Sequence, residues 1–210
     1  MATRDVLIVT DVQNDFCPGG ALAVGEGDRI VPVINGIIDR FHRIVATQDW
    51  HPKHHMSFAS NHPGKKPYDQ VELGGIVQTL WPDHCVAGTA GAGFHPGLNP
   101  DRFDIIVRKG TNPAVDSYSA FLENDKKTRT GLDGYLKSIG ADRVFFCGLA
   151  TDYCVFYSAM DAASFGFDTL VIIDACRGID VPAGSIERSI GEMKGKGIRM
   201  IESKELLSLP

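Results

Sequence analysis

The sequence lacks the features that mark membrane-spanning proteins and small disulfide-bonded domains. No apolar run approaches the length of about 18 residues that a membrane-spanning helix needs. The first residues, MATRDVLIVTD, lead directly into a predicted strand instead of a signal sequence. The five cysteines are an odd number and lie far apart in a chain of 210 residues, which argues against a disulfide framework. We therefore expect a cytoplasmic protein without a membrane partner.

Three further absences exclude other classes of protein. No GxGxxG follows the first predicted strand and no GxxxxGK[ST] occurs anywhere, so the usual phosphate-binding loops are missing. No CxxC pair is present, which argues against a zinc ribbon or a thioredoxin-like site. The formal net charge is −5, without the basic excess that nucleic acid attracts. We expect no nucleic-acid partner.

What the chain does contain is an alternation of apolar, β-branched runs with helical patterns. Strands apolar on both faces are typical of a parallel sheet covered by helices. The predicted strands are Val6–Thr10, Arg43–Gln48, Asp104–Lys109, Arg143–Gly148, Thr169–Asp174 and Ile198–Glu202. The predicted helices are Gly27–Arg40, Thr130–Ile139, Asp152–Ser164 and Pro182–Lys196. We predict an α/β fold: one doubly wound domain over residues 1–210, with a central, mostly parallel six-stranded sheet and helices on both faces.

Residues 50–100 interrupt this alternation. They hold six of the seven histidines and more than half of the eleven prolines. A stretch this long with little regular structure is usually a functional loop or a disordered insert, and its Trp, Phe and His content argues against disorder. We expect a loop region that carries part of a functional site.

Chemically capable side chains follow four of the predicted strands. They are Asp11, Asp49, His51, Lys109 and Cys154. The carboxyl ends of parallel strands meet at one edge of the sheet, where the functional groups of doubly wound proteins gather. We therefore expect these side chains to converge there.

Three of them suggest nucleophilic catalysis. Cys154 lies in the first turn of a predicted helix, where the helix dipole and the Lys109 ammonium would favour the thiolate. Asp11 could take up the thiol proton and return it to a leaving group, while N–H groups of the ATDYC turn could bind an oxyanion. Each residue also has a purely structural interpretation, as a buried thiol, a capping carboxylate or a solvated strand end.

The DxH pair of Asp49 and His51 suggests a metal site. Residues two apart in an extended segment point the same way, so both can reach one ion. His84, in LWPDHCVAG, could complete a set of three ligands. Mixed nitrogen and oxygen ligands suit Zn²⁺, Mn²⁺ or Fe²⁺ better than Ca²⁺ or Mg²⁺. The alternative is a polar, histidine-rich loop, and a supporting role of His55 is left open.

Aromatic residues lie beside these groups in the sequence. Phe16 follows Asp11 by five positions, Trp81 precedes His84 by three, and Tyr153 is next to Cys154. Such rings could hold a flat apolar ring by stacking, although core packing explains each of them equally well.

Several of these stretches together resemble the nicotinamidases (pyrazinamidases) of the isochorismatase-like cysteine hydrolases. The matching pieces are DVQNDFCPGGAL (11–22), QDWHPKHHMSFAS (48–60), LWPDHCVAGTAGAGFHPGL (80–98), RKGTNPAVDSYSAF (108–121), GLATDYCV (148–155) and VIIDACRG (171–178). The resemblance covers residues 6 to about 200, and the combination is far more specific than any single piece.

The resemblance implies a role for each matching residue. Cys154 would be the nucleophile, Asp11 the general base and then acid, and Lys109 the residue that balances their charge. The oxyanion N–H groups would be those of Ala150 and Cys154, beside a cis Leu149–Ala150 peptide. The metal ligands would be Asp49, His51 and His84. The substrate-binding residues would be Phe16, Trp81, Tyr118, Ala150 and Tyr153.

The implied activity is hydrolysis of nicotinamide to nicotinate and ammonia through a Cys154 thioester, within NAD salvage, with pyrazinamide as a second substrate. One divalent ion would contact the pyridine nitrogen, with Zn²⁺ favoured and Fe²⁺ or Mn²⁺ as alternatives. A related amidohydrolase acting on an N-carbamoyl compound or another small amide is the competing interpretation, and a non-catalytic metal-binding protein is a more distant one. The thiol argues against the vinyl-ether hydrolysis of relatives that lack it. Homo-oligomerisation is left open.

Overall fold

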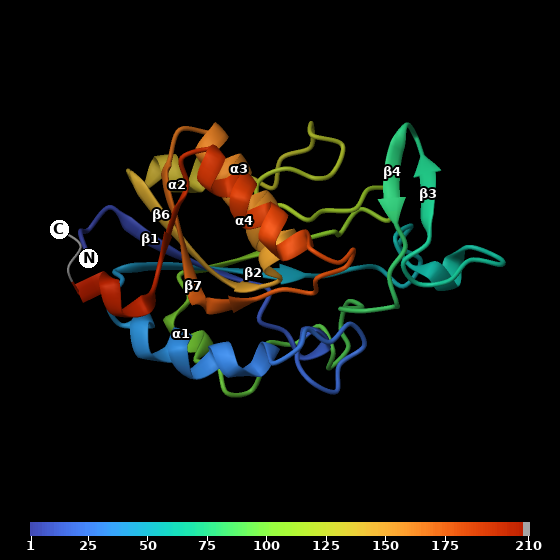
Figure 1. Cartoon of the computed structure of the whole chain (residues 1–210), viewed down its shortest axis with the longest axis horizontal. Helices are drawn as coiled ribbons and strands as arrows, with labels where there is room; N and C mark the ends of the chain where they lie inside the picture. Colours follow the sequence, from blue (N-terminus) through green and yellow to red (C-terminus); the bar gives the residue numbers. More distant parts are fainter. Residues whose placement is uncertain (208–210) are drawn as a thin grey trace.

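Six parallel strands form the central sheet of the structure, a computed structural model that describes residues 1–207 (Figure 1). In spatial order they are β5 (Ile105–Lys109), β2 (Arg43–Asp49), β1 (Asp5–Thr10), β6 (Arg143–Leu149), β7 (Asp168–Arg177) and β8 (Arg199–Ile201). Every neighbouring pair in this sheet is parallel. The predicted doubly wound α/β fold is therefore confirmed, with a sheet that is wholly parallel.

Helices cover both faces of this sheet (Figure 1). On one face lies α1 (Ile30–Ile38); on the other lie α2 (Leu132–Ser138), α3 (Phe156–Ser164) and α4 (Ser185–Gly195). Alternate residues of β1 enter the two layers of core: Leu7 and Val9 join the cluster that contains the apolar side chains of α1, and Ile8 joins the other cluster. Burial on both faces explains why these strands are continuous apolar runs.

The helices are shorter than the sequence patterns predict. The predicted helix 27–40 begins as a 3₁₀ turn, η2 (Gly27–Arg29), before α1. The predicted helix 152–164 begins as a π-helical turn, η5 (Thr151–Val155), and only then continues as α3. The remaining 3₁₀ turns are η1 (Asn14–Phe16), η3 (Ala59–Asn61), η4 (Pro100–Arg102) and η6 (Ser203–Leu207).

The region 50–100 contains more regular structure than the sequence analysis expects. β3 (Gln70–Leu73) and β4 (Ile76–Thr79) form an antiparallel hairpin. Gly74 and Gly75, with φ of 60° and 83°, connect them, since both positions of such a tight turn need positive φ. The expectation of a largely irregular stretch is wrong at this hairpin, which projects from the body of the molecule (Figure 1).

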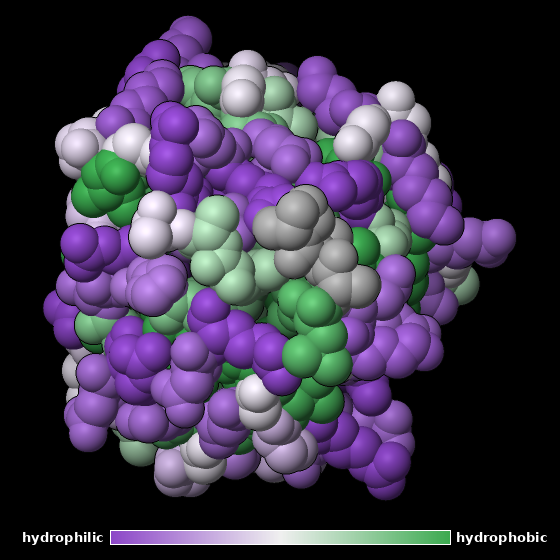
Figure 2. Space-filling model, turned by 90° about the vertical axis from the view of Figure 1, so that its left-hand side faces the viewer, coloured by the Kyte–Doolittle hydropathy of each residue, from purple (hydrophilic) through white to green (hydrophobic). Residues whose placement is uncertain are grey.

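The carboxyl ends of the strands point toward the hairpin, and the N-terminus and η6 lie at the opposite end of the molecule (Figure 1). Chain order reverses between β1 and β6, so the crevice beyond these two strands is the usual ligand site of such a sheet. Figure 2 shows the end with the N-terminus, where hydrophilic residues dominate among the described residues. None of the helices within residues 1–207 has the length and apolar character to cross a membrane.

Candidate active site

Asp11, Lys109 and Cys154 meet beyond the carboxyl ends of the strands. Asp11 follows β1, Lys109 ends β5, and Cys154 lies in the turn after β6. Lys109 Nζ lies 2.9 Å from Asp11 Oδ2 and 3.3 Å from Cys154 Sγ. A carboxylate oxygen of Asp11 is within 4.8 Å of Cys154 Sγ. The expected convergence of these three side chains is present in the structure.

Thr47 of β2 holds the Asp11 carboxylate in place. Its hydroxyl donates to Asp11 Oδ1 at 2.6 Å and accepts from the Asp11 N–H at 3.2 Å. Asp11 itself has a φ of 48°, in the left-handed region. Oδ2 is buried and forms an ion pair with Lys109 Nζ at 2.9 Å, but it accepts no hydrogen bond of good geometry from the described residues. Because Thr47 occupies Oδ1, Oδ2 is the oxygen left to accept a proton from a nearby thiol.

Lys109 is a fully buried cation surrounded by acceptors. Besides Asp11 and Cys154, its Nζ contacts Asp49 Oδ1 and donates to the Ser117 carbonyl at 3.0 Å. Burial alone lowers the pKa of a lysine, but the Asp11 and Asp49 carboxylates raise the pKa of Lys109 well above its usual value. The side chain is an ammonium that neutralises buried negative charge.

The Cys154 thiol differs from the sequence-based expectation. Burial raises the pKa of Cys154 well above its usual value; the Lys109 ammonium acts to lower it, and the Asp11 and Asp49 carboxylates act to raise it. The thiol also lies in a π-helical turn, not in the first turn of an α-helix. Burial raises the pKa of Asp11 as well, against the lowering effect of Lys109. Burial thus favours the thiol form of Cys154, and a carboxylate oxygen of Asp11 lies within 4.8 Å of its Sγ.

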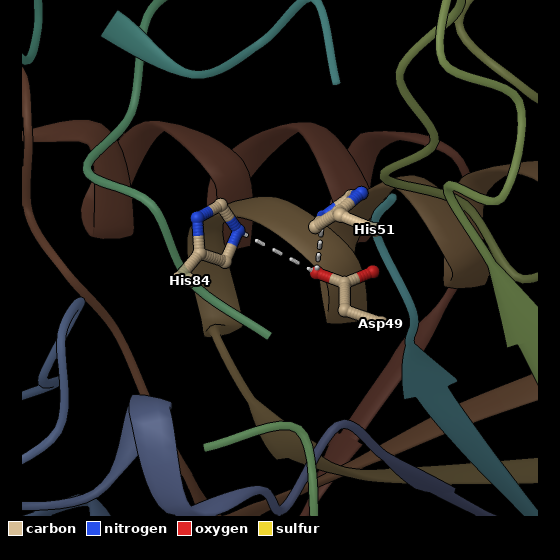
Figure 3. Close-up of side chains that lie close together, drawn as sticks. All are labelled: Asp49, His51 and His84. Atoms are coloured by element: carbon tan, nitrogen blue, oxygen red, sulfur yellow. Dashed lines mark ion pairs between the residues drawn. The ribbon is translucent and has the colours of Figure 1, made fainter. Parts of the chain in front are cut away.

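Asp49, His51 and His84 form a second cluster (Figure 3). Its Asp49 carboxylate contacts Lys109 Nζ. Asp49 Oδ2 lies 3.5 Å from His51 Nε2 and 3.9 Å from His84 Nε2. The other ring nitrogens face carbonyls, with His51 Nδ1 2.9 Å from Gly110 O and His84 Nδ1 2.7 Å from Pro82 O. Protonation at Nδ1 leaves both Nε2 lone pairs directed at the same point, which suits a divalent metal ion.

The charges of this cluster also suit a cation. Burial tends to raise the pKa of Asp49, but Lys109 and the histidines hold it below its usual range. Burial lowers the pKa of His84 to about 4, so this ring is neutral. For His51, burial opposes protonation and the Asp49 carboxylate favours it, with the pKa raised overall. One carboxylate and two imidazoles with buried ligand atoms fit a zinc-like ion.

His55, whose role the sequence leaves open, lies beside this cluster. Its ring is 4.3 Å from that of His51, and its Nδ1 is 2.7 Å from Ser57 Oγ. His55, His51 and Asp116 also bring ligand atoms within 4.8 Å of one another. Asp116 was not among the predicted site residues, because it lies seven positions beyond the nearest strand end and no local pattern marks it.

A pocket of about 360 Å³ opens onto both clusters. Every residue predicted to bind substrate lines it: Phe16, Trp81, Tyr118, Ala150 and Tyr153. Trp81 Nε1 donates to Tyr118 Oη at 3.1 Å, and the Trp81 ring meets that of Tyr153 edge to face at 5.0 Å. Leu22, Asp116 and Ile179 complete the lining and were missed by sequence reasoning. Such a cleft, lined by aromatic and aliphatic side chains with a few polar groups, suits a small flat ligand.

The Leu149–Ala150 peptide is cis, as the family resemblance implies. The Ala150 carbonyl accepts from the N–H groups of Tyr153 and Val155, both at 3.1 Å, and so closes the turn around Cys154. This turn carries the two backbone N–H groups, of Ala150 and Cys154, that the sequence analysis expects at an oxyanion site.

The chain is similar to known proteins over nearly its whole length. Residues 5–205 match the model of the Isochorismatase domain. A nicotinamidase of Acinetobacter baylyi is 50% identical over 206 residues, which span 98% of this chain and 96% of that protein. An Escherichia coli nicotinamidase is 46% identical over 195 residues, 91% of each.

Solved structures of nicotinamidases and pyrazinamidases are also similar to this chain. The Acinetobacter baumanii nicotinamidase matches with a TM-score of 0.96 and 50% identity, covering 98% of this chain and 99% of that one. The pyrazinamidase of Pyrococcus horikoshii, in complex with zinc, matches with a TM-score of 0.78 and 39% identity, covering 95% and 99%. The chain therefore belongs to the isochorismatase family, among the relatives named nicotinamidase.

Proposed function

We propose that the protein hydrolyses nicotinamide to nicotinate and ammonia through a thioester on Cys154. The observation that carries this proposal is the contact of one buried ammonium, that of Lys109, with the Asp11 carboxylate and the Cys154 thiol at the pocket wall. The names of the relatives at 50% and 46% identity support the choice of substrate.

In the first half of the reaction, Cys154 Sγ attacks the carboxamide carbon. The thiol proton passes to Asp11, a bond forms between sulfur and carbon, and the carbonyl electrons move to oxygen. The backbone N–H groups of Ala150 and Cys154 stabilise this oxyanion. Asp11 then gives its proton to the amide nitrogen, the carbon–nitrogen bond breaks, and ammonia leaves a thioester behind.

In the second half, water attacks the thioester carbon. Asp11, again a carboxylate, takes a proton from that water, and the carbon–sulfur bond breaks. The proton returns to the departing sulfur, and nicotinate is released. Asp11 alternates between carboxylate and carboxylic acid during the reaction. The Lys109 ammonium faces both this group and the sulfur, so it offsets the negative charge on whichever of them carries it.

We further propose that Asp49, His51 and His84 hold one divalent ion, and that Zn²⁺ is the favoured ion. Bound there, it supplies a Lewis acid for the ring nitrogen of the substrate and so fixes the orientation of the ring. The zinc complex of the Pyrococcus horikoshii pyrazinamidase supports this ion. Phe16 and Trp81 contact the faces of the ring, and pyrazinamide, with nearly the same shape, is a second substrate.

The test is ammonia release from nicotinamide by the purified protein and by Cys154→Ala. We expect release by the wild type and a loss of at least about 10³-fold in the variant, because the bond-forming atom is gone. Cys17→Ala, which removes a buried thiol outside the pocket, is the control and should retain turnover. Near-native turnover by Cys154→Ala would refute the mechanism, and turnover of an N-carbamoyl compound in preference to nicotinamide would refute the substrate.

A further inference from the structure

Asp152, two residues before the nucleophile, directs its carboxylate into a neighbouring loop. Oδ1 accepts from the Ile179 N–H at 2.9 Å, and Oδ2 accepts from the Asp180 N–H at 2.9 Å. Oδ2 also accepts from Ser185 Oγ at 2.5 Å. The side chain is 5% exposed. Three donors therefore satisfy this buried carboxylate, and none of them belongs to the groups that react with substrate.

The segment that Asp152 holds, here called loop 178–185, comprises the connection from β7 to α4 together with Ser185, the first residue of α4, and forms part of the pocket wall. Ile179 lines the pocket together with Tyr153 and Cys154. A second bond reinforces the attachment, since Tyr153 Oη donates to the Val181 carbonyl at 2.6 Å. Two consecutive residues of the nucleophile turn thus fasten the same loop.

The turn that carries Asp152 packs closely against loop 178–185. A Cβ at Gly178 would lie 2.5 Å from the side chain of Ile186 and 3.0 Å from Asp152 Oδ1. The bonds to Asp152 are charge-assisted, which makes them stronger than bonds between neutral groups. An amide in place of the carboxylate has a single acceptor oxygen, so at least one loop N–H would lose its partner.

We propose that Asp152 is a positioning residue for substrate binding: its carboxylate fixes loop 178–185 so that Ile179 closes the pocket against the bound ring. Asp152 does not act on Cys154 itself. This inference rests on the proposed hydrolysis of a small aromatic carboxamide and adds to it the residue that sets one wall of the binding site.

The first test compares Asp152→Asn with the wild type in steady-state kinetics and amide hydrogen exchange. KM for nicotinamide should rise about tenfold while kcat stays within about threefold, because the pocket loosens and the reacting groups stay in place. Exchange at the Ile179 and Asp180 amides should accelerate at least tenfold, since these N–H groups donate to the carboxylate.

A matched control is Asp174→Asn. Asp174 likewise accepts a backbone N–H and a hydroxyl from one residue, Ser203, at 2.8 and 2.5 Å, but it does not line the pocket. This variant should leave KM unchanged. An equal rise in KM in both variants would mean that the effect is a general loosening of the fold and would overturn the proposal.

A double-mutant cycle with Ile179→Ala tests whether Asp152 acts through the loop. Ile179→Ala alone should raise KM with no change in exchange at Asp180. If Asp152 acts through Ile179, the double variant should show about the KM of the worse single variant. Multiplicative effects on KM, or a fall in kcat at constant KM in Asp152→Asn, would overturn the proposal.

Ser185→Ala provides a milder change if Asp152→Asn does not fold. It removes one of the three donors, so we expect a smaller rise in KM, about two- to threefold, with faster exchange at Asp180. Unchanged KM and unchanged exchange would contradict the proposal that Asp152 fixes loop 178–185. A wild-type protein that releases no ammonia from nicotinamide would refute only the proposed function, because amide exchange at Ile179 and Asp180 would still test whether Asp152 fixes the loop.

Discussion

Lys109 illustrates how much of the site depends on a single residue. Its ammonium contacts two buried carboxylates, those of Asp11 and Asp49, and the Cys154 sulfur. Replacing it with methionine keeps the volume but leaves two buried carboxylates without their cation. Removing one partner of a buried ion pair costs about 3–5 kcal/mol, so Lys109→Met should lower the free energy of unfolding by that amount. Chemical denaturation measures it.

Lys126→Met is the control for this prediction. Lys126 forms an exposed ion pair with Asp161 at 3.5 Å, and such pairs contribute about 0–1 kcal/mol. The same loss of stability in both variants would contradict the role of buried charge at Lys109.

Gly110 is a second residue on which the site depends, because a side chain at this position would collide with His51. Its φ is 63°, and a Cβ there would lie 2.3 Å from His51 Cε1 and 2.5 Å from Nδ1. Gly110→Ala should therefore displace the His51 ring and weaken binding of Zn²⁺ at least tenfold, measured by competition with a chromophoric chelator. Gly131→Ala separates the two effects: its φ is 96°, but no atom lies within 4 Å of the added Cβ. That variant should bind Zn²⁺ normally, and equal weakening in both would exclude the collision as the cause.

The ends of the predicted strands locate part of the site, whereas pocket residues such as Trp81 and Tyr118 were predicted from the family resemblance. Asp11, Lys109 and Cys154 follow from the rule that strand ends meet at one edge. Thr47 and Asp116 do not follow, because their contacts join segments far apart in the chain: Thr47 bonds Asp11, 36 positions away, and Asp116 bonds Gln78, 38 positions away. The pKa of Cys154 was misjudged for a related reason, since burial is a property of the folded chain and outweighs the local helix.

At the level of elements, the β3–β4 hairpin is attached to the pocket by one buried side chain. Gln78 is 2% exposed while its neighbour Val77 is 66% exposed. Its Nε2 donates to Asp116 Oδ2 at 2.8 Å and to Tyr118 Oη at 3.3 Å. Because Asp116 and Tyr118 line the pocket, the hairpin and the binding site share this contact.

Gln78→Ala should therefore raise KM for nicotinamide about three- to tenfold while kcat changes little. The reason is that Tyr118 and Asp116 lose a donor, whereas the groups around Cys154 keep theirs. Steady-state kinetics provide the measurement. Val77→Ala removes an exposed side chain from the same strand and should leave both constants unchanged; a similar rise in KM there would show that any change in the hairpin has this effect.

The two strands of the hairpin were not among the predicted elements, although a signal for them exists. Gly74-Gly75 lies between QVEL and IVQT, and a Gly-Gly pair between two short runs favours a two-residue turn. The surrounding prolines and histidines suggested a loop, and strands of four residues carry too little periodicity to outweigh them. The strands of the central sheet were predictable because burial on both faces leaves long apolar runs.

At the scale of the whole molecule, the sheet brings distant segments to one crevice. β1 and β6 are neighbours although they are more than 130 positions apart, and this pairing places Asp11 beside the turn of Cys154. Alternation of strands and helices predicted the fold class, but the order of the strands depends on packing that no single segment encodes. That the chain forms one domain over residues 1–210 stays a prediction, and residues 208–210 lie outside the described range.

Metal binding at the proposed site should stabilise the whole molecule, because the three proposed ligands join β2 to the loop region. Asp49 ends β2, whereas His84 follows the hairpin. An ion that binds only the folded state at about 100 times its Kd adds about 2.7 kcal/mol, which corresponds to roughly 5–10 °C in Tm for a chain of this size. Removing the ion with a chelator should lower Tm by that amount in differential scanning calorimetry, and Zn²⁺ should restore it. His84→Ala should melt at the same temperature with and without chelator, while His95→Ala, which changes a histidine of the same region outside the cluster, should respond as the wild type does. A wild-type protein that contains the metal and melts at an unchanged temperature after its removal would contradict this coupling.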